Sequence, residues 1–152
     1  MTINILGINH KNTPIEVREK LLFNKKSMPI ALDDIKKIDG VNEVVLVSTC
    51  NRTEIYTENE RDNSSVLAWL KRQHPTEDIS VYTYNHQGEK AVKHLFEVAS
   101  GVDSMVVGEN EIFGQVKHAY KIADEQKTVD STLKKLFEFT FSVAKEIRTD
   151  TD

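Results

Sequence analysis

The chain has 152 residues, of which 39% are hydrophobic and 29% are charged. This length and composition suit one folded domain and exclude a disordered chain. The 20 Lys and Arg residues against 24 Asp and Glu residues give a net charge of −4. That balance argues against a free-standing nucleic-acid-binding protein, because such proteins usually carry a basic excess.

Cysteine content and hydropathy exclude several further classes. The one cysteine rules out an internal disulfide and a multi-cysteine zinc site within one chain. The longest strictly apolar run, at 44–47, is too short to span a bilayer. The N-terminus lacks the basic head and long apolar stretch of a signal peptide. We therefore expect a cytoplasmic protein with no membrane partner.

Alternation and turn residues in the first half of the chain predict an α+β fold. Strands are expected at 2–9, 44–47, 53–58 and 79–84, where residues are β-branched or alternate between apolar and polar. Helices are expected from Pro14 onward, at about 29–38, and from about 63 to a point before Pro75. The resulting β-α-β-β-α-β order is that of a ferredoxin-like antiparallel sheet with helices on one face.

The second half of the chain is predicted to add further helices at its C-terminal end. Helical spacing favours segments at about 87–100, 109–127 and 129–148. No buried element is expected after the last helix, so we interpret the chain as one part of a longer protein.

The candidate nucleophile is Cys50, which follows the predicted strand at 44–47. A lone cysteine is often only a small buried apolar residue. Its neighbours, however, are polar and turn-prone, as is typical of loops that carry reactive groups: Ser48, Thr49, Asn51 and Arg52. If the backbone stays extended, Cys50, Arg52 and Glu54 point to the same side, and the guanidinium favours the thiolate.

A second polar cluster brackets the apolar run at 105–107. Gly101 and Gly108 fit two helices joined by a loop, an arrangement that needs no function. The polar residues around the run indicate a lined pocket instead: Asp103, Ser104, Glu109 and Gln115. The stretch holds no dinucleotide fingerprint, because the glycine spacing is wrong and no strand leads directly into it.

The five histidines are scattered, and none forms the HExxH pair of a metal site. We therefore expect no metal. His94 differs from the others because it lies among apolar residues on a predicted helix. A histidine in such a place is more often half-buried and hydrogen-bonded than catalytic.

Three blocks of the sequence resemble the glutamyl-tRNA reductase family. The first begins at Gly7-Ile8-Asn9-His10-Lys11 and continues with Thr13, Pro14, Arg18 and Glu19. The second, at 48–56, resembles the family's nucleophile motif, and the third runs from His94 to Lys117. The blocks follow the family's order, but its NADPH-binding and dimerisation domains have no counterpart. Residues 1–152 thus resemble the N-terminal catalytic domain, truncated before the others.

The resemblance implies a covalent mechanism. The Cys50 thiolate would attack the ester carbon of glutamyl-tRNA and form a glutamyl thioester. NADPH, bound by the absent domain, would then reduce the thioester to glutamate-1-semialdehyde, in the first step of five-carbon tetrapyrrole biosynthesis. The chain alone is expected to form the thioester and hydrolyse it slowly, without reducing it.

By motif position, the resemblance also implies a pocket for the glutamyl group. Arg52 is expected to clamp the side-chain carboxylate, and Glu109 with Glu54 to meet the α-ammonium. His94 would orient or polarise the reacting ester. Glu111 stands where the family usually has Gln, which favours the ammonium over the carboxylate. The other expected substrate-binding residues are Thr49, Asn51, Ser104, Asn110 and Gln115.

The implied partners are glutamyl-tRNA, a second copy in a homodimeric full-length protein, and the aminomutase of the following step. Two other functions stay open on the residues alone. A cysteine esterase or hydrolase of aminoacyl esters would need a base beside Cys50. A non-catalytic module that binds tRNA or a partner would show no acyl transfer to Cys50.

Overall fold

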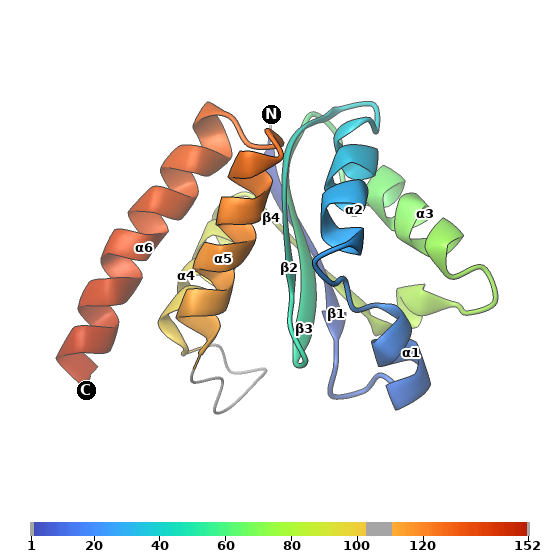
Figure 1. Ribbon diagram of the computed structural model, residues 1–152, viewed down its shortest axis with the longest axis horizontal. Helices are drawn as coiled ribbons and strands as arrows, with labels where there is room; N and C mark the ends of the chain where they lie inside the picture. Colours follow the sequence, from blue (N-terminus) through green and yellow to red (C-terminus); the bar gives the residue numbers. More distant parts are fainter. Residues whose placement is uncertain (1, 103–110, 152) are drawn as a thin grey trace.

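The computed structural model describes residues 2–102 and 111–151, which fold around a four-stranded antiparallel sheet (Figure 1). The strand order is β2-β3-β1-β4, with β1 at Thr2–Asn9, β2 at Val41–Ser48, β3 at Arg52–Asn59 and β4 at Thr83–Gln87. Each strand is antiparallel to its neighbour. The α+β class and the ferredoxin-like antiparallel sheet expected from the sequence are confirmed.

Helices cover both faces of this sheet. The bounds are α1 at Ile15–Lys20, α2 at Ser27–Lys36, α3 at Ser64–Gln73, α4 at Glu89–Ser100, α5 at Ile112–Glu125 and α6 at Ser131–Thr151. Helices α2 and α3 lie on one side and α4, α5 and α6 on the other, with α5 running along the edge strand β2 (Figure 1). Among the described residues, no helix has the length and apolar character needed to cross a membrane.

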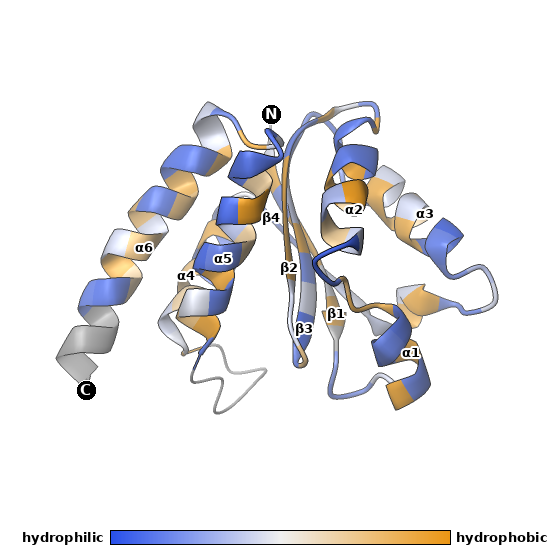
Figure 2. Ribbon diagram, viewed as in Figure 1, coloured by the Kyte–Doolittle hydropathy of each residue, from blue (hydrophilic) through white to orange (hydrophobic). Residues whose placement is uncertain are grey.

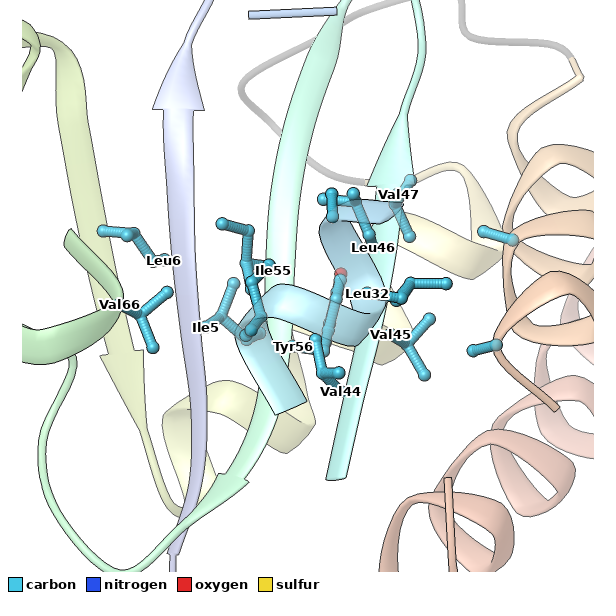
Figure 3. Close-up of a cluster of buried hydrophobic side chains, with 14 of the residues drawn as sticks. Ile5, Leu6, Leu32, Val44, Val45, Leu46, Val47, Ile55, Tyr56 and Val66 are labelled. Atoms are coloured by element: carbon cyan, nitrogen blue, oxygen red, sulfur yellow. The ribbon is translucent and has the colours of Figure 1, made fainter. Parts of the chain in front are cut away.

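The core forms where the apolar sides of the helices meet the sheet, as the hydropathy colouring in Figure 2 shows. The apolar run at 44–47 is fully buried, as expected for a strand that is covered on both faces. In Figure 3, Leu6 of β1 points toward Val66 of α3 on one side of the sheet, and Leu32 of α2 lies over β2. The two strands β2 and β3 are thus buried and hydrogen-bonded to each other up to the turn that joins them.

The strand expected at 79–84 is wrong in its position. Residues Ile79–Tyr82 form a 3-10 helix, and the strand begins only at Thr83. The hydroxyl of Thr83 donates to the carbonyl of Ser80 at 2.9 Å, and the hydroxyl of Ser80 donates to Asp78 at 2.5 Å. These short-range bonds favour a turn, while Ile79 still reaches the core. The shift brings Tyr84 and His86 onto the sheet.

The start of α6 is fastened to β2 by a buried carboxylate. Glu43 Oε1 accepts hydrogen bonds from the backbone N–H groups of Asp130, at 2.6 Å, and Leu133, at 2.9 Å. Beside it, Thr128 exchanges two bonds with Val44, one through its carbonyl at 2.8 Å and one through its hydroxyl at 2.9 Å. Glu43 thereby satisfies N–H groups that the helix leaves unpaired at its N-terminus.

We predict that Glu43→Ala lowers the free energy of unfolding by about 1 to 2 kcal/mol, because it removes the acceptor for these N–H groups. The loss is expected even though the change also relieves a like-charge pair with Glu58, which lies directly opposite on β3. Urea unfolding measures the effect. Asp39→Ala is the matched control, since Asp39 forms an exposed ion pair with Arg61. Equal losses in the two variants would contradict the anchoring role of Glu43.

Candidate active site

Cys50 lies exposed in a tight turn between β2 and β3. The turn is shaped by Thr49, whose hydroxyl accepts hydrogen bonds from the N–H groups of Asn51 and Arg52, each at 3.2 Å. The N–H of Thr49 also donates to the carbonyl of Arg52 at 2.8 Å. The turn expected at this place is confirmed, but Cys50 is not part of an extended strand with Arg52. Alternation therefore does not fix the direction of the thiol.

The strand ends on either side of the turn are tied to the segment that follows α1. Ser48 and Thr53 are paired across the two strands. The Ser48 hydroxyl accepts from the N–H of Phe23 at 3.0 Å, and the Thr53 hydroxyl donates to the carbonyl of Leu21 at 3.1 Å. These two hydrogen bonds hold both strand ends in place, so the turn is carried by a fixed part of the sheet. Reactive groups are often found on loops that are held in this way.

Below the turn, the fully buried carboxylate of Glu54 collects hydrogen bonds from three separate parts of the chain. On its own strand, Arg52 Nη1 donates at 3.2 Å and the Tyr56 hydroxyl at 2.7 Å. The Tyr84 hydroxyl of β4 and Nε2 of His94 on α4 each lie 2.5 Å from Oε2. Arg52 and His94 are themselves buried, with 2% and 7% of their surfaces exposed.

Tyr84 reaches Glu54 by crossing over β1. Gly7 on β1 pairs with Glu54 on one side and with Tyr84 on the other. A side chain at Gly7 would overlap the Tyr84 ring, so glycine is required here by a close approach and not by its backbone angles. Gly7 therefore joins the two outer partners into one network.

Glu54 stays ionised in this environment. Burial alone would raise the pKa of its carboxyl, but the hydrogen bond from His94 and the positive charge of Arg52 outweigh burial and lower the pKa to about 2. An ionised carboxylate only accepts hydrogen bonds, so Nε2 of His94 must carry a proton. Burial, together with the adjacent Glu54 charge, raises the pKa of Tyr56 well above its ordinary value, which keeps that hydroxyl a donor.

His10 is a second buried histidine at the same end of the sheet. It follows β1, is 6% exposed, and has no hydrogen-bond partner for either ring nitrogen among the described residues. Burial and the positive charges of Arg18 and Arg52 lower its pKa to about 4, against a smaller raising effect of Glu54. His10 is therefore neutral at neutral pH.

The structure divides the residues expected at the site into three groups. Arg52, Glu54 and His94 are brought together in one buried cluster, and Thr49, Cys50 and Asn51 form the turn above it. Glu111 and Gln115 line a recess between α2 and α5, together with Ser48 at the end of β2. Ser104, Glu109 and Asn110 lie outside the described residues.

Burial changes what two of these residues can do. Glu54 has no exposed surface and its oxygens are occupied by four donors, so it holds its neighbours in place and does not reach a substrate ammonium. The Thr49 hydroxyl accepts two hydrogen bonds within the turn, and it therefore shapes the turn.

Sequence reasoning missed Tyr84, His86 and His10. The rings of His86 and His94 stack with centroids 4.5 Å apart, and the ring of Tyr84 lies 5.7 Å from that of His94. The correct register of β4 would have revealed the first two, because Tyr84 and His86 alternate onto one face of the strand. His10 carries no such signal, since it follows the strand in a turn.

The described residues do not provide a dinucleotide site. All neighbouring strands are antiparallel, whereas such sites form at the ends of parallel strands that lead into a glycine-rich turn and a helix. Within residues 2–102 and 111–151, no three His, Cys, Asp or Glu side chains are grouped closely enough to hold a metal ion.

Comparisons with known proteins agree on one family. Residues 6–151 match the family model described as Glutamyl-tRNAGlu reductase, N-terminal domain. Proteins named glutamyl-tRNA reductase from Xanthomonas campestris pv. phaseoli and Neisseria meningitidis serogroup C are 47% and 44% identical over 99% of this chain. The solved glutamyl-tRNA reductase from Methanopyrus kandleri is 36% identical, with a TM-score of 0.78 over 97% of this chain and 34% of its own. The chain spans about a third of the length of these relatives, 35% and 36% for the two bacterial proteins.

We predict that Glu54→Gln lowers the free energy of unfolding by roughly 3 to 5 kcal/mol, because it removes the charge that Glu54 sets against the buried Arg52 cation. Glu58→Gln is a matched control, since Glu58 is also buried on β3 but has an oxygen without a partner among the described residues. That control is expected to lose little or nothing in urea unfolding. A similar loss in both variants would show that the Glu54 cluster is not special.

We also predict that His10→Phe flattens the dependence of stability on pH. The pKa of His10 is about 4 in the folded chain against 6.5 for an ordinary histidine, so the unfolded chain takes up the proton first. Wild-type stability is then complete above about pH 6.5 and falls by up to about 3 kcal/mol as the pH drops to 4. The measurement is urea unfolding at several pH values. An unchanged slope in the variant would contradict the burial of a neutral His10.

Proposed function

The chain belongs to the glutamyl-tRNA reductase family, and from this premise we propose that it carries out the acyl-transfer half of that reaction. In this proposal Cys50 takes the glutamyl group from its ester with tRNA. The product on the protein is a thioester, and the released product is free tRNA. The observation that carries the proposal is the exposed Cys50 turn, which leads directly into Arg52 of the buried Arg52–Glu54–His94 cluster.

The proposed step exchanges one acyl bond for another. The Cys50 thiol loses its proton, and the sulfur attacks the carbonyl carbon of the ester. A carbon–sulfur bond forms, the bond from that carbon to the ribose oxygen breaks, and the oxygen leaves with a proton as a hydroxyl group. Hydrolysis of the thioester by water would return the thiol and release glutamate.

The charged cluster gives each residue a distinct part in this proposal. Arg52 offers a cation to the glutamyl carboxylate, and its position is already held by the bond to Glu54. Such a fixed partner disfavours acyl groups without a carboxylate, because they leave the guanidinium poorly paired. His94 has Nε2 committed to Glu54, so any proton that it exchanges with the substrate must pass through Nδ1.

In this proposal the residues of this chain do not carry out the reduction of the thioester. The family's name implies a reduction, and we propose that hydride from NADPH supplies it after acyl transfer. The antiparallel sheet does not fit that cofactor, so no step through it is derived for this chain. A cytoplasmic homodimer, delivery of the aldehyde to an aminomutase and entry into tetrapyrrole synthesis belong to the same proposal.

Rapid mixing of the chain with glutamyl-tRNA, without NADPH, tests the proposal by intact-protein mass spectrometry. We expect wild type to gain the mass of one glutamyl group, and Cys50→Ser to gain no thiol-linked adduct. Hydroxylamine should remove the wild-type adduct, since it cleaves thioesters. Because Cys50 is the only cysteine, a thioester adduct can form only there.

Two other results would assign a different function. Release of glutamate at the same rate by Cys50→Ser would indicate a hydrolase that does not use this thiol. Intact ester, no adduct and unchanged tRNA binding in Cys50→Ser would favour a non-catalytic binding module.

A further inference from the structure

A recess lies at the end of the sheet that is opposite to the Cys50 turn. Strand β3 begins directly after that turn, and the recess lies near its other end, where β1, α4 and α6 begin (Figure 1). The recess has a volume of about 300 Å³ and is lined by Thr2, Ile3, Glu58, Gly88, Val92 and Thr132. It shares no residue with the Glu54 cluster, so it is separate from the proposed acyl-transfer site.

Glu58 places a carboxylate in this recess. Side chains alternate along β3, so Glu58 points to the same sheet face as Glu54 and Tyr56, toward α4 and α6. Only 3% of Glu58 is exposed, and its Oε1 is buried without a hydrogen-bond partner among the described residues. Buried carboxylates are normally paired with a cation or with several donors, because the loss of hydration is costly. Glu54 follows this rule, whereas Glu58 lacks such a partner at Oε1.

The two helices that begin at the recess have backbone donors committed to other acceptors. The N–H groups at the start of α6 donate to Glu43. The N–H of Gly88, at the start of α4, donates to the carbonyl of Ile3 at 2.9 Å. Glu43 also lies directly opposite Glu58 on β2, so its charge adds to the negative potential there. Two neighbouring carboxylates favour a cation at the recess and repel an anion.

The other lining residues indicate which kind of cation fits. Ile3 and Val92 offer apolar walls, which suit an aliphatic chain. A Ca²⁺ or Mg²⁺ ion would need more oxygen ligands than one carboxylate and two hydroxyls. A primary ammonium has three N–H donors, and Glu58 with the hydroxyls of Thr2 and Thr132 supplies three acceptors. The recess therefore combines acceptors for an ammonium with walls for an apolar chain.

We propose that this recess binds a primary ammonium group on an unbranched aliphatic chain, with the ammonium at Glu58 and the chain between Ile3 and Val92. The volume of about 300 Å³ lies at the lower end of the range for small-molecule sites, as suits a ligand of this size. Free aliphatic amines and lysine side chains of another protein segment share this chemistry. The inference does not depend on acyl transfer at Cys50.

The test is an NMR titration of the nitrogen-15-labelled chain with butylammonium chloride. Tetramethylammonium chloride is the matched probe, because the two cations are isomers with the same charge and only butylammonium has N–H donors. Glu58→Gln removes the charge in the recess and keeps the shape of the side chain. Glu60→Gln is the control variant, since it removes the same charge at an exposed position just beyond β3.

We expect butylammonium to shift the amide signals of Ile3, Val92 and Thr132 in a saturable way and to raise the unfolding temperature. Glu58→Gln should weaken this binding roughly 10-fold or more, because a hydrogen bond between two charged groups is lost. Glu60→Gln should bind within about 2-fold of wild type, since an exposed charge contributes little. Tetramethylammonium should bind wild type at least about 10-fold more weakly than butylammonium does.

A second probe distinguishes the two sources of the ammonium. Nα-acetyl-lysine methylamide carries the same aliphatic ammonium on a peptide backbone. Binding of this probe as tight as that of butylammonium would support a lysine side chain of another protein segment as the ligand. Binding of butylammonium alone would support a free amine, because the recess would then exclude the peptide backbone.

Three results would overturn the inference. Without saturable shifts in wild type, the recess would bind no ammonium and Glu58 would be buried without a cationic partner. Equal binding by Glu58→Gln, or equal binding of the two isomeric cations, would mean that the carboxylate does not recognise the ammonium. The amide spectrum of Glu58→Gln without ligand shows that the variant is folded, so its loss of binding reports on the recess.

Discussion

A buried negative charge organises this domain. Glu54 has no contact with water, and an isolated carboxylate in that position would be very costly. It is tolerated because Arg52, Tyr56, Tyr84 and His94 donate to it from β3, β4 and α4. Removing any one donor weakens the compensation for the charge. The sheet order, the glycine on β1 and the position of α4 are therefore linked through one side chain.

This constraint explains how a small chain fixes a buried cation directly after the exposed Cys50 turn. The cluster fixes Arg52 and His94 on one side of the Cys50 turn, where they supply charge and a proton position. In our account the glutamyl ester lies at the Cys50 turn, with its acyl group toward this cluster. Preorganised groups of this kind lower the barrier without moving during the reaction.

The sequence predicts the strands and turns of this site better than the contacts between them. The apolar run at 44–47 and the polar residues after it indicate a buried strand that ends in a turn, and the structure contains both. The burial of Glu54 was not predictable, because its donors come from distant segments and Tyr84 lies on a strand whose start was misplaced. The alternation of 79–84 fits a strand, but the bonds around Ser80 favour a 3-10 turn.

The ionisation of Glu54 is the most direct test of this account. A carbon-13 NMR titration of the chain with labelled glutamate would follow its side-chain carboxyl signal as the pH is lowered. The account predicts that Glu54 remains ionised well below the ordinary carboxyl range, with a pKa near the value of about 2 that His94 and Arg52 impose. A midpoint at or above 4.5 would mean that burial dominates, and Glu54 would then not be the fixed charge that holds Arg52 and His94 in place.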